Sequence, residues 1–108
     1  MALKITNNAT TTLAAAISST DTAVTVASGT GALFPSLGVG DSFQATLQDT
    51  NNNYEIVSVT ARTDDAMTIT RAQAGTLAIA FPVNSRFEIR VTAANLQDHI
   101  DGLDFLLL

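Results

Sequence analysis

The chain has 108 residues, of which 46% are hydrophobic and only 14% are charged, and ten acidic side chains against five basic ones give a net charge of -5. This length suits one small domain with a modest core and is too short for two. The basic residues are scattered, so the clustered positive charge that binds nucleic acid is missing. The chain has no cysteine, which excludes disulfides, thiolate metal sites and a cysteine nucleophile.

The low charge is a first indication of function. An ordinary soluble domain has about 25% charged residues, and here Thr, Ala, Ser and Asn fill the difference. Small polar residues pack against another protein without a large desolvation cost, so the composition favours a subunit of an assembly, a homo-oligomer, over a free monomer. The alternative is a monomer that is simply rich in threonine.

The first twelve residues predict an extended N-terminal arm, residues 1–12. Two short apolar runs, 2–5 and 12–17, are separated by a polar stretch rich in turn-forming residues. Leu3 and Ile5 are candidate contacts of this arm with another protein. The arm lacks the apolar run of a secretory signal, and no stretch approaches the ~20 apolar residues that span a bilayer, so we expect a soluble product without a cleaved signal.

A β domain, residues 13–91, is predicted after the arm. Its first strand lies near residues 13–17, where the alanines also favour a helical turn but the β-branched neighbours favour extended chain. After a turn, residues 23–26 form a second strand, because Val24 and Val26 alternate with smaller residues.

Residues 28–41 predict a packed Ω-type loop. Four glycines and one proline interrupt any regular element there. The apolar residues that still favour burial are Leu33, Phe34, Leu37 and Val39. Leu33 and Phe34 are candidate partner contacts or, alternatively, core residues. A phosphate-binding loop is disfavoured, because neither a lysine nor a helix accompanies these glycines.

Three consecutive antiparallel strands are predicted in the middle of the chain, at residues 43–48, 54–60 and 66–71. In each strand apolar residues recur at every second position, which places one row toward the core. Glu55 and Arg71 share the parity of the inward rows, near the outer ends of their strands, so we expect a cross-strand ion pair. Residues 61–65 are predicted to join the last two strands as a five-residue hairpin loop.

The end of the β domain contains one crossing segment and one strand. Residues 72–83 are predicted to cross over and cap an open end of the sheet. Residues 86–91 show the clearest alternation in the chain, with Phe87 and Ile89 on one face and charged residues on the other.

A C-terminal amphipathic helix is predicted for residues 92–108, with Thr92 as its N-cap. Its apolar stripe, at spacings of four, three and four, consists of Leu96, Ile100, Leu103 and Leu107. The last turn is apolar on all sides: Phe105, Leu106, Leu107 and Leu108. Because a terminal aliphatic cluster is costly to leave in water, we expect it to contact a neighbouring subunit, with burial in its own domain as the alternative.

Side chains capable of catalysis or metal binding are few and isolated. His99 is the only histidine, so a metal site or a catalytic triad lacks its other members. Asp64 and Asp65 fit a turn better than a calcium site, which needs six or more oxygens. Glu55 and Glu88 are single carboxylates on separate strands. We therefore expect no catalytic residues, no cofactor, no metal and no enzyme activity.

Several segments carry a resemblance to a known family when taken in order: residues 31–35, 40–47, 55–62, 71–76, 78–81 and 90–93. Their order and spacing resemble a small virion domain of tailed bacteriophages, found alone or at the N-terminus of tail-fibre and other tail-associated proteins. The chain departs from that pattern in two turns, at Ala74, where the family often has an acidic residue, and at Asn84 and Ser85, where it has Gly-Asp.

The resemblance implies a non-catalytic structural module that docks onto tail, neck or capsid proteins in several symmetry-related copies. It implies a location in the virion, assembled in the host bacterial cytoplasm. From the scattered basic residues and the short apolar runs we expect neither nucleic acid nor a membrane as a partner. Because the chain stops after the predicted helix, a stand-alone adaptor or fibre-attachment subunit is expected. A capsid decoration protein that uses residues 1–12 as an arm is the alternative. A carbohydrate-binding module is weaker, because Tyr54 is the only tyrosine and tryptophan is missing.

The sequence therefore predicts a mainly β fold, a small β-sandwich or partly open barrel of about six or seven antiparallel strands with a C-terminal α-helix. The interface candidates are Leu3, Ile5, Leu33, Phe34, Leu103, Phe105, Leu106, Leu107 and Leu108.

Overall fold

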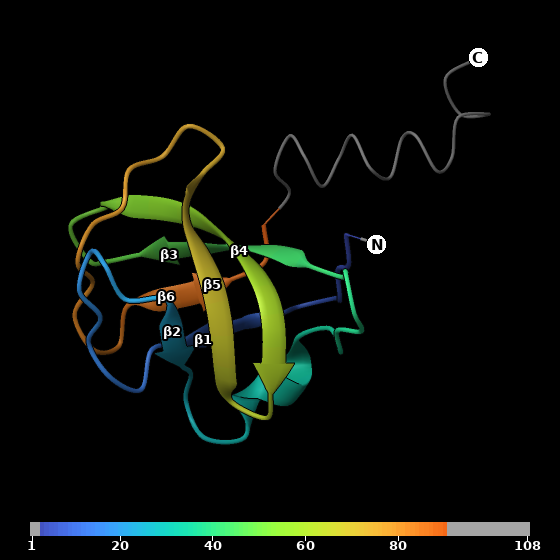
Figure 1. Ribbon diagram of the computed structural model, residues 1–108. Helices are drawn as coiled ribbons and strands as arrows, with labels where there is room; N and C mark the ends of the chain where they lie inside the picture. The colour runs from blue at the N-terminus through green and yellow to red at the C-terminus, as the bar shows by residue number, and fades with distance from the viewer. Residues whose placement is uncertain (1–2, 91–108) are drawn as a thin grey trace, which may run out of the picture.

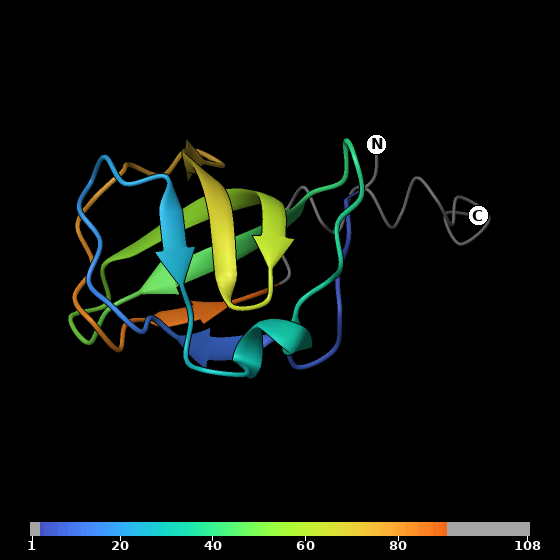
Figure 2. The same cartoon turned by 60° about the horizontal axis from the view of Figure 1, so that its bottom comes forward.

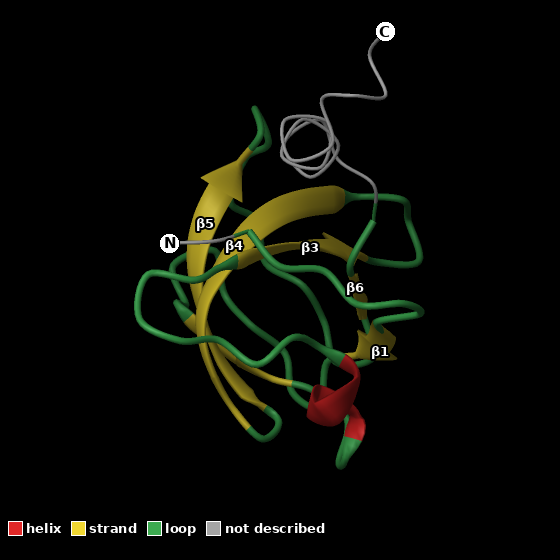
Figure 3. Cartoon of the chain, turned by 90° about the vertical axis from the view of Figure 1, so that its right-hand side faces the viewer, coloured by secondary structure: helices red, strands yellow, loops and turns green. Residues whose placement is uncertain are grey.

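The computed structural model describes residues 3–90. They form one curled six-stranded antiparallel sheet, a half-barrel, in the order β1-β6-β3-β4-β5-β2 (Figures 1 and 3). The elements in chain order are β1 (Thr10–Thr12), β2 (Ala23–Thr25), the short 3-10 helix η1 (Thr30–Leu33), β3 (Phe43–Gln48), β4 (Tyr54–Thr63), β5 (Ala66–Gln73) and β6 (Arg86–Glu88). The mainly β prediction is confirmed, and a partly open barrel describes the sheet better than a sandwich. The predicted helix 92–108 lies outside the described residues.

The two edge strands approach each other just beyond their ends. Leu13 and Val26 form an isolated antiparallel bridge. The Ala14 N–H donates to the Thr25 carbonyl at 2.9 Å, and the Ala27 N–H donates to the Thr12 carbonyl at 3.0 Å. The bridge between the ends of the two edge strands, β1 and β2, therefore holds the sheet in its curled form (Figure 2).

The core lies inside the curl and follows the predicted alternation. Phe43, Ala45 and Leu47 of β3 are fully buried, and so are the inward residues of β4, Val57 and Val59. The larger of these side chains each contribute about 1.5–3 kcal/mol by leaving water. Aromatic rings close one side of this core: Phe34 packs against Phe43 and Phe87, with ring centroids 5.6 and 5.4 Å apart.

The predicted five-residue loop between β4 and β5 is wrong. β4 continues to Thr63 and pairs it with Ala66, so that only Asp64 and Asp65 form the turn. Asp64 has a φ of 53°, a left-handed conformation that aspartate tolerates better than most residues. Register shifts within β4 and β5 let these strands run longer than their apolar residues indicated.

The N-terminal part and the loop 28–41 also differ from expectation. β1 begins at Thr10, inside the predicted arm, because three β-branched threonines pair with β6. Residues 13–17 contribute only isolated bridges, at Leu13 and Ile17. In the loop, Phe34 is buried, but Leu33 and Val39 are exposed, so the expectation of burial is wrong for these two.

Candidate functional site

The predicted ion pair between Glu55 and Arg71 is confirmed. The Glu55 side chain is fully buried, and the side chain of Arg71 is only 9% exposed. The Arg71 guanidinium donates two hydrogen bonds to the carboxylate, from Nε to Oε2 at 2.9 Å and from Nη2 to Oε1 at 2.8 Å. This two-pronged geometry is the strongest form of an Arg–carboxylate contact.

Backbone groups satisfy the rest of the ion pair. Glu55 also accepts the N–H groups of Ala72 and Ile79, at 2.8 and 3.1 Å. Arg71 donates to the carbonyls of Ser18, Asp21 and Ile79. Burial by itself raises the pKa of Glu55, but the bonds from Arg71 and from the two backbone N–H groups outweigh it and hold that pKa below its ordinary value. A carboxylate held charged by four donors is suited to fastening loops rather than to transferring protons.

A second carboxylate, Asp65, holds the turn between β4 and β5 against the loop that contains η1. The Asp65 carboxylate accepts the backbone N–H groups of Gly29 and Gly31, at 2.9 and 2.8 Å. These two bonds lower the pKa of Asp65. A Cβ atom on Gly31 would lie 2.0 Å from the Asp64 carbonyl oxygen, so only glycine allows this close approach. The predicted turn role of Asp64 and Asp65 is confirmed by their place between the strands.

Glu88 forms a small ionic group on the outer side of β6. Its carboxylate accepts Arg90 Nε at 2.6 Å and the Thr10 hydroxyl at 2.9 Å, and it lies 3.5 Å from Arg86. Burial raises the pKa of Glu88, whereas the bonds from Arg90 and Thr10 lower it by more. Arg90 also donates to the Gln48 side chain on β3. The group links three neighbouring strands and contains only one carboxylate.

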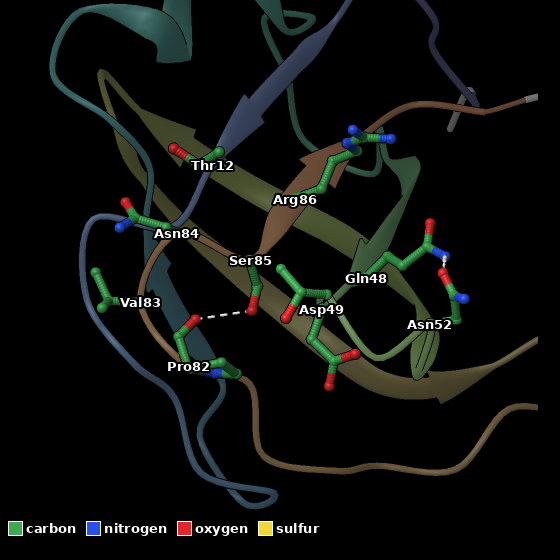
Figure 4. A pocket seen from close by; sticks show the side chains of 10 residues that line it. Thr12, Gln48, Asp49, Asn52, Pro82, Val83, Asn84, Ser85 and Arg86 are labelled. Carbon is green, nitrogen blue, oxygen red and sulfur yellow. Dashed lines mark hydrogen bonds between the residues drawn. The ribbon is translucent and has the colours of Figure 1, made fainter.

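An open depression of about 460 Å³ lies between the turn after β3 and the turn before β6 (Figure 4). Several of its polar side chains bond within the loops that carry them. Asp49 accepts the N–H groups of Asn51 and Asn53, and the Ser85 hydroxyl donates to the Pro82 carbonyl. The depression therefore has the chemistry of structured loops, with no convergent pair of acid and base among the side chains that line it.

The interface candidates of the arm and the loop occupy one side of the molecule. Leu3 forms a bridge with Ser42, and the Thr6 hydroxyl donates to the Leu33 carbonyl at 2.6 Å. Ile5 is 43% and Leu33 is 44% exposed. Phe34 is a core residue, which was the alternative that the sequence left open. Leu103 and residues 105–108 lie outside the described residues.

Sequence reasoning missed an uncharged patch on the outer side of β2, β5 and the second half of β4, strands that lie side by side in Figure 1. We call it the Ala/Thr face. Its six exposed residues are Ala23, Thr25, Ala61, Thr63, Ala66 and Thr68. The sequence showed Ala23 and Thr25 alternating with Val24 and Val26, but only the strand register shows that the six residues adjoin.

Comparison with known proteins adds no assignment. No family model matches the sequence, and no curated protein matches it either. Across residues 3–90, no three histidine, cysteine or carboxylate side chains gather as metal ligands would. That same part of the chain contains no helix long and apolar enough to cross a membrane.

Proposed function

We propose that the chain is a non-catalytic structural protein of a tailed-bacteriophage virion, a tail- or neck-associated adaptor or fibre-attachment subunit that acts by docking onto other proteins. The resemblance of its ordered segments to the phage virion domain supports this function. The structural observation that carries it is the Ala/Thr face, an exposed area of sheet without a charged side chain. Covering such a surface removes no ion from water, so docking there has a small desolvation cost.

Rigidity also supports a docking role. The buried Glu55–Arg71 pair fixes the loops around residues 18–21 and 79, and Asp65 fixes the turn beside the Ala/Thr face. A surface that is already ordered loses little conformational entropy when a partner covers it. In an assembly, modest contacts of this kind add up through symmetry and high effective concentration.

A capsid decoration protein is the second candidate. The observation that favours it is the apolar pair Ile5 and Leu33, each more than two fifths exposed, on the side where the N-terminal segment lies. Figure 2 shows this segment running beside the loop that follows η1. An N-terminal arm with exposed apolar side chains is suited to clamping adjacent shell subunits.

The copy number of the chain in purified particles tests both candidates. Quantitative mass spectrometry of virions from the phage that encodes the chain is expected to find a handful to dozens of copies for a tail or neck protein. Hundreds of copies would favour the capsid candidate. Absence of the chain from particles would overturn both.

Removal of residues 105–108 tests the predicted terminal contact separately. We expect the truncated chain to enter particles less efficiently, with Leu77→Ser, a change at another exposed apolar residue, as the control. Unchanged incorporation of the truncated chain would show that the terminal cluster is not the contact.

A further inference from the structure

The Ala/Thr face has an internal order that the register of its strands reveals. Across β4, β5 and β2, one row reads Ala61, Thr68, Ala23. The second row lies two residues along each strand, nearer the turn between β4 and β5, and reads Thr63, Ala66, Thr25. Larger and smaller side chains therefore alternate both along the strands and across them. All six are exposed, so this checkerboard belongs to the surface and not to the core.

A checkerboard of this kind is complementary to a copy of itself in one orientation. Consider a second copy turned over about an axis that lies in the face and runs across the strands, so that β5 packs on β5 antiparallel. Each row of one copy then lies on the other row of the second copy, and each threonine meets an alanine. Thr68 meets Ala66 of the second copy, and in the same way Thr63 meets Ala61 and Thr25 meets Ala23. Turning the copy about the strand direction instead places threonine on threonine in the middle of the contact. Two-fold symmetry therefore selects a single arrangement.

Charge opposes contact between two copies least at the Ala/Thr face. The chain has a net charge of -5, so two copies repel each other on average. The Ala/Thr face lacks charged side chains. Of the two acids in the adjoining turn, Asp65 directs its carboxylate to Gly29 and Gly31, and Asp64 is exposed at the border of the face. None of the exposed large apolar residues belongs to the face. A second copy needs neither an aromatic anchor nor an ion there, because its threonines fill the spaces beside the alanines.

We propose that the Ala/Thr face is a self-association surface, on which a second copy of this chain packs with β5 antiparallel to β5 and each threonine opposite an alanine. The inference rests on the proposed structural function for its biological setting, because it names the partner of one surface of an assembly subunit. Three strands about 4.8 Å apart and two rows give a contact on the order of 200 Å² for each copy. A stable free dimer buries about 800 Å² for each partner. The contact is therefore weak in solution and strengthens where the assembly holds copies together.

Crosslinking of paired single-cysteine variants suits a weak contact, and the chain has no cysteine of its own to interfere. Purified Ala66→Cys and Thr68→Cys chains, one of them carrying an affinity tag, are mixed at equal concentration and oxidised to disulfides, which form only where two Cβ atoms come within about 4.5 Å. Random collision gives about twice as much mixed product as either homodimer. The proposed packing predicts that the mixed product exceeds each homodimer about tenfold, because Cys replaces residues that face each other across the two-fold.

Two controls make the result decisive. A Thr10→Cys chain places the thiol on β1, an exposed position outside the face, and is expected to give only the collisional yield. Adding Ala61→Glu to both partners fills a hole and buries an unpaired charge, so the excess of mixed product is expected to disappear. A statistical product ratio, or a yield no higher than that of Thr10→Cys, would overturn the proposal. Because the assay uses purified chains, either result leaves the virion copy-number test independent.

Discussion

Two regions of the sheet differ in charge: the buried ion pair, where β4 begins and β5 ends, and the Ala/Thr face. At the first, Glu55 and Arg71 form an ion pair from which water is excluded and which holds two loops. At the second, three strands present only alanine and threonine. All five basic side chains of the protein contact a carboxylate or a backbone carbonyl. The basic side chains thus hold parts of the fold together, and the Ala/Thr face, which lacks charged side chains, is free to be covered.

Arg71→Ala is expected to have the largest effect on this comparison. It leaves the fully buried Glu55 carboxylate without its partner and frees the carbonyls of Ser18 and Asp21, which breaks a buried ion pair on one side only. We expect a loss of about 3–5 kcal/mol in the free energy of unfolding, measured by urea denaturation. Arg86→Ala, on a side chain that is 61% exposed, is the control and is expected to cost less than about 1 kcal/mol. Equal losses for the two variants would contradict the structural role of the pair.

Acidification is expected to weaken the same pair. The pKa of Glu55 in the folded chain lies below its ordinary value of 4.5. Its contribution to stability is therefore complete above that ordinary value and is lost as the pH falls through the lower, folded value. Urea denaturation between neutral pH and pH values below the ordinary one should show this decline, and Glu55→Gln should flatten it. An equally steep decline in Glu55→Gln would assign the acid sensitivity to other carboxylates, such as Asp65.

Gly31→Ala tests whether the turn beside the Ala/Thr face is as rigid as its contacts indicate. The new Cβ would lie 2.0 Å from the Asp64 carbonyl oxygen, so the turn or η1 must move, and we expect a loss of about 1–3 kcal/mol. Gly29→Ala is the matched control. It meets no atom within 4 Å and pays only for its positive φ of 81°, about 1 kcal/mol. A smaller loss for Gly31→Ala than for Gly29→Ala would contradict the close approach.

Glu88→Gln is expected to have a small effect. The carboxylate is partly exposed, and exposed ion pairs contribute about 0–1 kcal/mol. The melting temperature of this variant, measured by thermal unfolding, should be close to that of the wild-type chain and well above that of Arg71→Ala. A loss as large as that of Arg71→Ala would mean that the ionic group on β6 is as important to the fold as the buried pair.

Ala66→Glu is expected to change stability least. Ala66 is exposed on the outer side of β5, where most substitutions stay within about 0.5 kcal/mol. The same change places a charge in the middle of the Ala/Thr face. Measured on the same sample, the free energy of unfolding of Ala66→Glu should equal that of the wild-type chain, whereas its self-association should be lost. A large loss of stability would show that the position is part of the fold rather than of a contact.

The sequence was informative where apolar residues at every second position show which side of a strand faces the core. Phe43, Ala45 and Leu47 pointed to the core, and the shared parity of Glu55 and Arg71 indicated their ion pair. The 61–65 segment carries no apolar residue larger than alanine, so nothing in it showed that β4 continues through Ala61 to Thr63.

The Ala/Thr face could not be predicted for a related reason. Its pairs Ala61–Thr68 and Thr63–Ala66 depend on the register shift between Val59 and Ala61, and that shift is set by the pairing of whole strands. A composition rich in threonine and alanine indicated that some surface would be covered. It did not indicate which one.

Sedimentation velocity over a concentration series, with wild-type chain and Ala66→Glu side by side, tests most directly whether copies meet through the uncharged face. The account predicts that the average sedimentation coefficient of the wild-type chain rises with concentration, whereas that of Ala66→Glu stays at the monomer value. Identical behaviour of the two chains at every concentration, with both folded, would contradict it.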